Sequence, residues 1–273
     1  MSELQMGLSG QKRIAQAFSR AKSAGRAALM PYFPLGYPDR ERSLAIIEAI
    51  AAESDLLELG IPFSDPIADG ATIQQSTQVA LNQGTTSTTC LEMVQEIRRR
   101  GITTPALFMG YYNPILAYGE TAFVRDAARA GIDGLIVPDL PPEEADDLAR
   151  AVADEGLALI YFLTPTSTEE RVKMVLERAI GFIYMVSLTG VTGARNSIRA
   201  DLSGFVKAIR QQTNVPVAVG FGISTPAQAA AVGAFADGVI VGSALVNTVA
   251  DSDGSAEAAG RFAATLRGEL EFV

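Results

Sequence analysis

The sequence predicts an α/β protein, a single (β/α)8 TIM barrel over residues 1–273 with an extra N-terminal helix. Short apolar runs alternate eight times with longer segments of helical period, which is the pattern of repeated βα units on a parallel sheet. The length of 273 residues is typical of such a barrel, and no polar linker or change of composition divides the chain. An open doubly wound sheet is the alternative, but a count of eight units favours closure.

The elements follow in chain order from this alternation. A helix near Gln11–Ser23 is expected to precede the first strand and to close the bottom of the barrel. The expected strands are Ala28–Phe33, Asp55–Leu59, Ala106–Met109, Gly134–Val137, Ala158–Leu163, Phe182–Ser187, Pro216–Gly220 and Gly238–Val241. The expected helices between and after them are Arg40–Ala52, Thr89–Arg100, Tyr118–Ala130, Glu143–Glu155, Thr168–Ala179, Leu202–Gln212, Pro226–Ala234 and Ala256–Leu270.

Helix ends carry their own signals. Capping-box spacing is present at Thr89–Glu92, Ser167–Glu170 and Thr225–Gln228. Gly131 and Gly156 stand between a helix and the next strand, where a residue that adopts positive φ is favoured. These local signals agree with the barrel topology.

Composition excludes several kinds of protein. The chain has no histidine, which removes Ser-His-Asp and Cys-His nucleophile systems and HExxH zinc sites. A net charge of −9 argues against nucleic-acid binding, and the run Arg98–Arg100 ends a predicted helix, where cations suit the helix dipole. The single cysteine, Cys90, cannot form an internal disulfide, and no apolar run is long enough to cross a membrane. We therefore expect a soluble, cytoplasmic protein without a bound metal.

The most informative segment for chemistry is Leu56–Gly70. Glu58 lies in an apolar strand near its C-terminal end, where burial is expected to raise its pKa and suit it to proton transfer. Alternatively, Glu58 caps the barrel mouth by hydrogen bonds to loop backbone. Asp65 and Asp69 follow in a loop stiffened by two prolines, which either holds a functional carboxylate in place or forms ordinary Asx turns.

Glycines after the last two strands predict a phosphate site. Gly220–Ser224 follows the seventh strand, and Gly242 and Ser243 follow the eighth. In barrels of this class the loops after these two strands, with a helix N-terminus, commonly bind phosphate through backbone N–H groups. The glycines allow close approach, although turns also require glycine.

The loop after the sixth strand is a candidate lid. Its residues Ser187–Asn196 include two glycines and are long enough to close over a substrate, although a plain surface connection fits as well. Tyr184, on the strand before it, either fills the barrel interior or reaches the site with its hydroxyl.

The runs LELGIPFSDPIADG, YMVSLTGVTG, GFGIS and GSAL occur in this order, and with them nearly the whole chain resembles the alpha subunit of tryptophan synthase. The resemblance implies a (β/α)8 barrel that cleaves indole-3-glycerol phosphate to indole and glyceraldehyde 3-phosphate in L-tryptophan biosynthesis. It also implies Glu58 and Asp69 as the catalytic residues. The implied substrate-binding residues are Tyr184, Thr192, Gly193, Phe221, Gly222, Gly242 and Ser243. The chain departs from the common family pattern at Phe33–Pro38, which affects substrate contacts of the first loop.

The implied reaction is a retro-aldol cleavage, and aldolases ordinarily use a Schiff-base lysine or a zinc ion. The four lysines all fall in predicted helices, none at a strand end, and histidine is lacking. Protonation at C3 lets the indole ring accept the electrons itself, so two carboxylates suffice and no cofactor is expected on this chain. We expect Glu58 to handle the protons at the reacting carbons and Asp69 to accept the indole N–H bond.

The resemblance also implies a partner, a beta subunit that carries pyridoxal phosphate in an alpha2beta2 assembly. The loops around Asp65–Pro66, Asn113–Pro114 and Thr189–Arg195 are expected to surround the barrel mouth and form the docking surface. Two other functions are weighed against this one. Another phosphate-binding barrel, such as a sugar-phosphate isomerase or indole-glycerol-phosphate synthase, explains the glycine loops but not the run from Leu57 to Gly70. A non-catalytic scaffold that only activates a beta subunit predicts loss of Glu58 or Asp69, and both are present.

Overall fold

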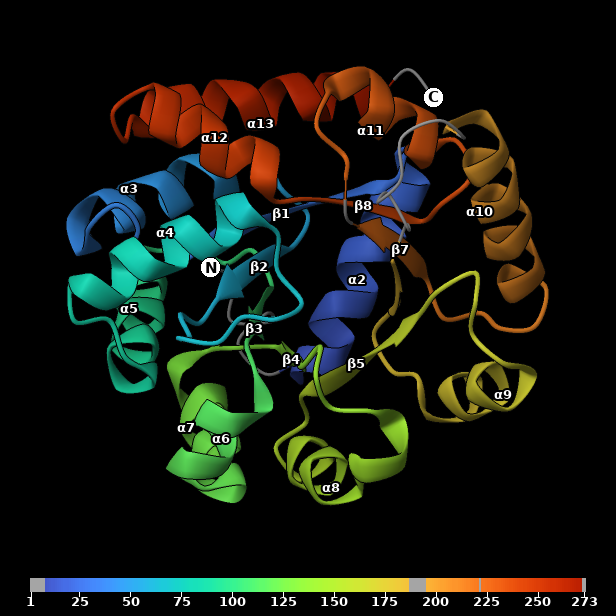
Figure 1. Cartoon of the computed structure of the whole chain (residues 1–273), viewed down its shortest axis with the longest axis horizontal. Helices are drawn as coiled ribbons and strands as arrows, with labels where there is room; N and C mark the ends of the chain where they lie inside the picture. Colours follow the sequence, from blue (N-terminus) through green and yellow to red (C-terminus); the bar gives the residue numbers. More distant parts are fainter. Residues whose placement is uncertain (1–7, 187–194, 221, 272–273) are drawn as a thin grey trace.

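The computed structural model describes residues 8–186, 195–220 and 222–271, and its eight strands close into a barrel (Figure 1). The strands follow one another around the barrel in sequence order, all parallel, and β1 pairs with both β2 and β8. The predicted fold class is therefore confirmed. The strands are β1 Ala28–Pro34, β2 Leu57–Gly60, β3 Ala106–Met109, β4 Gly134–Ile136, β5 Ala158–Leu163, β6 Ile183–Val186, β7 Val217–Gly220 and β8 Gly238–Val241.

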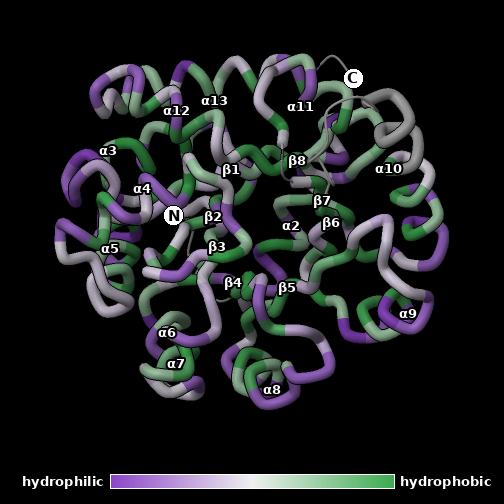
Figure 2. The backbone as a smooth tube through the Cα atoms, viewed as in Figure 1, coloured by the Kyte–Doolittle hydropathy of each residue, from purple (hydrophilic) through white to green (hydrophobic). Residues whose placement is uncertain are grey.

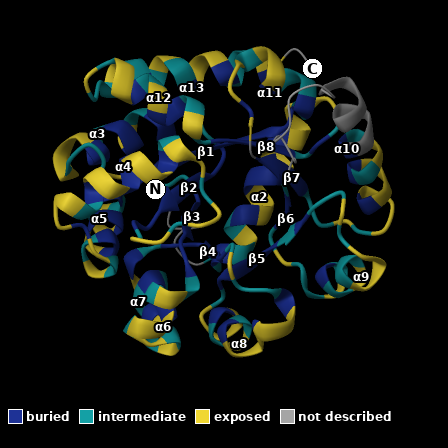
Figure 3. Ribbon diagram, in the orientation of Figure 1, coloured by how far each residue is buried: buried dark blue, intermediate teal, exposed yellow. Residues whose placement is uncertain are grey.

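Helices surround the barrel and turn their polar faces outward, while the strands are buried (Figures 2 and 3). No helix in the described part of the chain is long and apolar enough to span a membrane. Around the barrel lie α3 Arg40–Ala51, α4 Ala71–Asn82, α5 Ser87–Arg99, α6 Tyr112–Tyr118, α7 Glu120–Ala130, the 3-10 helix η1 Pro142–Glu144, α8 Asp146–Asp154, α9 Glu169–Arg178, α10 Arg195–Arg210, α11 Pro226–Gly233, α12 Ser243–Asp251 and α13 Ala256–Leu270.

Apart from shifts of one or two residues at element ends, the structure differs from the predicted elements in five places. The predicted helix Glu143–Glu155 divides into η1 and α8, and the other four differences are as follows. Helices α4, α6 and α12 are additional, and α10 begins at Arg195 rather than at Leu202, within the segment predicted as a lid. Helix α4 buries Ile73, Ser76, Thr77 and Ala80, so small and polar side chains form much of its inner face. Such a helix lacks the broad apolar stripe by which periodicity identifies helices.

Two of the three predicted capping boxes are wrong. Thr86, not Thr89, caps α5. The Thr86 side chain accepts the Thr89 N–H, and the Thr89 side chain, at the third helical position, accepts the Thr86 N–H. Thr168, not Ser167, caps α9. Neither Thr86 nor Thr168 has Glu or Gln three residues later, so the capping-box pattern favoured a neighbouring residue over the one that begins the helix.

At Thr225, the cap is confirmed, since its side chain accepts a hydrogen bond from the Gln228 N–H. The Gln228 side chain does not complete the box, because it accepts the Ser224 N–H instead, at 2.8 Å. Gly131 and Gly156 have the predicted positive φ, of 101° and 69°.

Helix α2, Gly10–Ser23, covers the N-terminal ends of the strands as predicted (Figure 1). The Gln11 side chain donates to the Leu157 carbonyl oxygen, just before β5, at 2.8 Å. The rings of Phe18 and Phe182, the latter just before β6, have centroids 5.6 Å apart. This end of the barrel is closed, so a ligand must enter from the opposite end, where the strands terminate.

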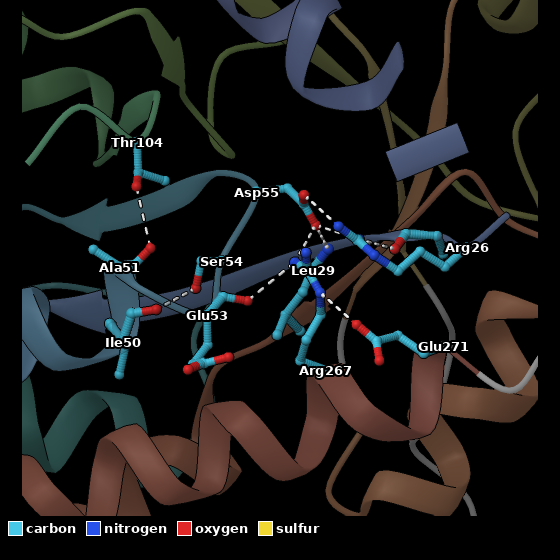
Figure 4. Close-up of polar contacts among 11 residues, drawn as sticks. Arg26, Leu29, Ile50, Ala51, Glu53, Ser54, Asp55, Thr104, Arg267 and Glu271 are labelled. Atoms are coloured by element: carbon cyan, nitrogen blue, oxygen red, sulfur yellow. Dashed lines mark hydrogen bonds and ion pairs between the residues drawn. The ribbon is translucent and has the colours of Figure 1, made fainter. Parts of the chain in front are cut away.

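Aspartates strengthen the closed end. Asp55 accepts the Leu29 N–H at 2.8 Å and binds the Arg26 and Arg267 guanidinium groups at 2.6 Å and 3.1 Å (Figure 4). Asp133, just before β4, and Asp237, just before β8, likewise accept a backbone N–H of the preceding strand and pair with an arginine. These buried or partly buried carboxylates therefore have structural partners.

The first arginine of the run Arg98–Arg100 belongs to this set. Its guanidinium pairs with Asp133 at 3.2 Å and donates to three carbonyl oxygens, those of Ile102, Thr104 and Gly131. The interpretation of this run as structural rather than ligand-binding is thus supported for Arg98.

Candidate active site

The Glu58 carboxyl group lies inside the barrel on β2. Tyr32 of β1 is its register partner, and paired residues of neighbouring strands project to the same side of the sheet. The side chain is fully buried, and neither carboxyl oxygen has a hydrogen-bond partner in the described part of the chain. Burial, and to a smaller degree the charge of Asp69, raises the pKa of Glu58 from 4.5 to about 8. Glu58 is therefore protonated near neutral pH and can donate a proton.

Asp69 lies in the loop between β2 and α4. Burial raises the pKa of its carboxyl group to about 6, and a hydrogen bond from the Tyr111 hydroxyl acts in the opposite direction. Near pH 7 Asp69 is consequently ionised while Glu58 is neutral. Two carboxyl groups whose pKa values are pushed apart in this way are suited to different roles, one as an acid and one as a stabilising charge.

Two further tyrosines flank the carboxyl groups. A Cβ added to Gly60 would lie 2.2 Å from the Tyr32 Oη, and one added to Gly220 would lie 2.4 Å from the Tyr184 Oη. Each hydroxyl group thus occupies the space that a side chain at the glycine would need. Burial, followed by the charges of Glu58 and Asp69, raises the pKa of both tyrosines well above the ordinary value, so both stay neutral.

Aromatic rings gather around this group. The rings of Phe162 and Tyr184 have centroids 4.7 Å apart, and those of Phe63 and Tyr111 are 5.4 Å apart. An apolar, aromatic environment suits a planar aromatic ligand, and it is also what raises the pKa of the buried carboxyl groups.

The glycines predicted to bind phosphate lie at the ends of β7 and β8. Gly222 is exposed and has a φ of 74°, which a residue with a side chain rarely adopts. Gly242 precedes α12, and the exposed Ser243 is its first residue. Backbone N–H groups in the first turn of a helix have no intrahelical acceptor, so this end of α12 can receive an anion.

The Tyr32 side chain contacts both the start of α12 and the strand that carries Glu58. A Cβ added to Gly242 would lie 3.3 Å from the Tyr32 Cβ atom, a tight contact, while the hydroxyl of the same tyrosine reaches Gly60 on β2. Gly242 therefore stands next to the residue that borders Glu58.

Three predicted site residues, Thr192, Gly193 and Phe221, and most of the predicted lid lie outside the described residues. The structure brings Glu58, Asp69 and Tyr184 together: the charge of Asp69 raises the pKa of Glu58, and the charges of both carboxyl groups raise the pKa of Tyr184. In the described ranges, no three His, Cys, Asp or Glu side chains gather closely enough to hold a metal ion.

Sequence reasoning missed Tyr32 and Tyr111. Tyr111 follows β3 directly, so the rule that site residues lie after strand ends was a signal that could have found it. Tyr32 lies in a strand whose residues are all buried, and no alternation distinguishes its inward from its outward side chains. Its direction follows only from its register with Glu58.

Comparison with known proteins gives a consistent result. The sequence model of the family described as "Tryptophan synthase alpha chain" matches residues 18–271. A protein of that name from Chloroflexus aurantiacus is 52% identical over 236 residues, which cover 86% of this chain and 89% of the relative. One from Dehalococcoides mccartyi is 46% identical over 260 residues, covering 95% and 99%.

Solved structures agree. The tryptophan synthase subunit alpha of Legionella pneumophila superposes with a TM-score of 0.88 at 36% identity, covering 96% of this chain and 99% of that one. A structure of Mycobacterium tuberculosis tryptophan synthase superposes with a TM-score of 0.86 at 39% identity, covering 97% and 99%.

Proposed function

Since the chain belongs to the tryptophan synthase alpha chain family, we propose that Glu58 and Asp69 are the two catalytic groups of its reaction. The chain is a lyase that cleaves indole-3-glycerol phosphate to indole and glyceraldehyde 3-phosphate in L-tryptophan biosynthesis, and it pairs with the tryptophan synthase beta subunit. The observation that carries the proposal is the Glu58 carboxyl group, fully buried and without a hydrogen-bond partner in the described part of the chain.

Glu58 performs the proton transfers. The neutral carboxyl group donates its proton to C3 of the indole ring, which leaves the ring nitrogen positively charged. The resulting carboxylate then takes the proton of the glycerol hydroxyl next to the scissile bond. The carbon–carbon bond breaks, its electrons return to the ring, and indole and the aldehyde are released. A pKa of about 8 keeps Glu58 protonated at the start of this sequence and basic enough to complete it.

Asp69 stabilises the charge that develops in between. Its pKa of about 6 leaves it ionised near neutral pH, so it can accept the indole N–H bond. That hydrogen bond strengthens as the ring nitrogen becomes positive, which lowers the energy of the transition state more than that of the bound substrate.

Remote contacts bind the rest of the substrate. We assign the phosphate to the backbone N–H groups near Gly222, Gly242 and Ser243, together with Gly193 and Phe221, and the indole ring to the surroundings of Tyr184 and Thr192. The supporting observations are the positive φ of Gly222 and the start of α12 at Ser243. Binding by backbone dipoles reconciles a net charge of −9 with an anionic substrate.

The proposed mechanism requires no cofactor on this chain, and pyridoxal phosphate belongs to the beta subunit alone. Lys12, Lys22, Lys173 and Lys207 are all exposed on helices, so none is placed to form a Schiff base at the carboxyl groups. We also propose that residues 1–273 act as one domain, because α2 and α13, from opposite ends of the chain, both contact β1. The buried thiol of Cys90 fits a reducing compartment, and we propose the cytoplasm.

The proposed docking surface for the beta subunit, in an alpha2beta2 assembly, is the rim of the barrel mouth. Ile67, in the loop that carries Asp65 and Asp69, is 84% exposed, and Leu116 of α6 is 53% exposed. Exposed apolar residues of this kind often mark protein interfaces. The predicted segment Thr189–Arg195 lies largely outside the described residues.

The experiment that tests the proposal measures indole release from indole-3-glycerol phosphate, with and without a beta subunit. We expect Glu58→Gln and Asp69→Asn to lose most turnover, because each removes a proton donor or a charge. The control is Glu177→Gln, which changes an exposed glutamate on α9 and is expected to keep wild-type turnover. Near-wild-type cleavage by a folded Glu58→Gln variant contradicts the acid–base role. If Asp69→Asn changes only KM, Asp69 does not stabilise the developing charge. If the wild-type chain stimulates the beta subunit but releases no indole, the alternative of a non-catalytic scaffold is supported.

A further inference from the structure

We propose that Tyr111 is a positioning residue, which holds Asp69 in its working place by clamping the loop between β2 and α4. The inference rests on the proposed role of Asp69. Tyr111 stands directly after β3, at the start of α6, and is 4% exposed. It therefore reaches the loop of Asp69 from a different strand, as a buried and sterically confined side chain.

Two contacts hold the loop, one near each end. The Tyr111 hydroxyl oxygen accepts the Ala68 N–H at 2.9 Å, and its ring packs against that of Phe63, with centroids 5.4 Å apart. Between these contacts the loop extends into solvent, as the 84% exposure of Ile67 indicates. The residue next to Asp69 is thus tied to a rigid part of the barrel.

The loop has little else to hold it against the barrel. In the described part of the chain, the Ile61 N–H donates to the Met109 carbonyl oxygen. Beyond that residue, hydrogen bonds join the loop to itself, as from the Asp69 N–H to the Pro66 carbonyl oxygen, or to Gln74 at the start of α4. Without the Tyr111 hydroxyl, residues 64–69 would have no hydrogen bond to a strand or strand-end loop among the residues that the structure describes.

The same hydroxyl also acts on the Asp69 carboxyl group. Since its oxygen accepts the Ala68 N–H, its own proton is free to point at the carboxylate. The nearby hydroxyl lowers the pKa of Asp69 against the effect of burial. One side chain thereby sets both the position and the charge of Asp69.

Tyr111 is itself held in place from behind, because the N–H of the next residue, Tyr112, donates to an Asp139 oxygen at 2.9 Å. The side chain that accepts the Ala68 N–H is therefore anchored outside the loop that it holds.

The test is Tyr111→Phe, with Tyr112→Phe as a matched control. The Tyr112 hydroxyl also bonds to a carboxylate, donating to Glu120 at 2.9 Å, but on α7. In assays with the beta subunit at saturation, we expect Tyr111→Phe to lower kcat/KM about tenfold or more, with a loss in kcat, as for a hydrogen bond to a charged group. The acidic limb of its pH profile should move to higher pH, because the pKa of Asp69 rises. Tyr112→Phe should match the wild type in both measurements.

A double variant distinguishes a role of Tyr111 in positioning Asp69 from a structural effect that does not involve Asp69. If Tyr111 acts through Asp69, Tyr111→Phe adds little to the loss in Asp69→Asn. If the losses of the two single variants instead add in full in the double variant, the inference is overturned. An unchanged rate and pH profile in Tyr111→Phe would also overturn it, and in both cases the role assigned to Asp69 would stand. Full activity in Asp69→Asn would instead overturn the role of Asp69, and the inference with it.

Discussion

Replacement of Glu58 by glutamine is expected to stabilise the protein relative to the wild type as the pH rises. Folding raises the pKa of Glu58 from 4.5 to about 8, so between these values the folded state holds a proton that the unfolded state has released. The stabilisation from that proton is complete below pH 4.5 and is lost as the pH rises through about 8. At about 1.36 kcal/mol for each pH unit, the whole change in the free energy of unfolding is about 5 kcal/mol.

Glutamine has no proton to lose in this range. Its buried amide costs about 1–3 kcal/mol if it finds no partner, but this cost is the same at every pH. The stability of Glu58→Gln relative to the wild type should therefore increase by about 4 kcal/mol between pH 5 and pH 9, the part of the whole change that falls in this range. The Glu58 carboxyl group is thus expected to destabilise the folded protein at high pH, because it has no hydrogen-bond partner in the described part of the chain.

The assay is equilibrium unfolding in urea, followed by circular dichroism, at pH 5, 7 and 9. Wild type, Glu58→Gln and the control Glu177→Gln are compared at each pH. The control should follow the wild type, since its side chain is exposed on α9. Parallel curves for Glu58→Gln and the wild type across this range would refute the reasoning, because they would mean that Glu58 titrates alike in the folded and unfolded states.

Three more predictions follow from the site and the closed end of the barrel. The pH profile of kcat/KM should rise through about 6, as Asp69 ionises, and fall through about 8, as Glu58 loses its proton; a profile flat across this range would contradict the assigned protonation states. In urea unfolding, Asp55→Ala should lower the free energy of unfolding by about 3–5 kcal/mol, because it leaves two arginines without their buried partner, and a loss below 1 kcal/mol would count against this. Gly60→Ala should cost about 1–3 kcal/mol and reduce turnover, because its Cβ would press on Tyr32, whereas Gly204→Ala, with open space around it, should cost nothing.

Much of the fold was predictable from local pattern. Strands β3, β5 and β8 have the predicted bounds, and the closed barrel is confirmed. In an amphipathic strand or helix, apolar residues recur with the period of that element, so the sequence reveals it. Gly131 and Gly156 mark helix ends because a positive φ depends on the residue at that position alone. Helix α4 was missed because a face made of Ser76, Thr77 and Ala80 carries little apolar periodicity.

The candidate site was predictable in part. Glu58 and the glycines after β7 and β8 were singled out because a carboxyl group in an apolar strand and paired glycines at strand ends are unusual within short stretches of sequence. The residues alone left Asp69 open between a functional carboxylate and an Asx turn, and the family resemblance singled it out. Their assigned roles remain predictions. The alternative that Glu58 caps the barrel mouth is not supported, because its carboxyl oxygens have no partner in the described ranges.

The sequence alone pointed to carboxylates as the candidate catalytic groups, because histidine is lacking and the lysines fall in predicted helices. The environment of those carboxylates depends on the closed barrel. Pairing of β1 with β2 places Tyr32 beside Glu58, and pairing of β2 with β3 brings Tyr111 to the loop of Asp69. Burial and hydrogen bonding, which set the two pKa values apart, arise between residues distant in the chain, and a local pattern carries no information about such contacts.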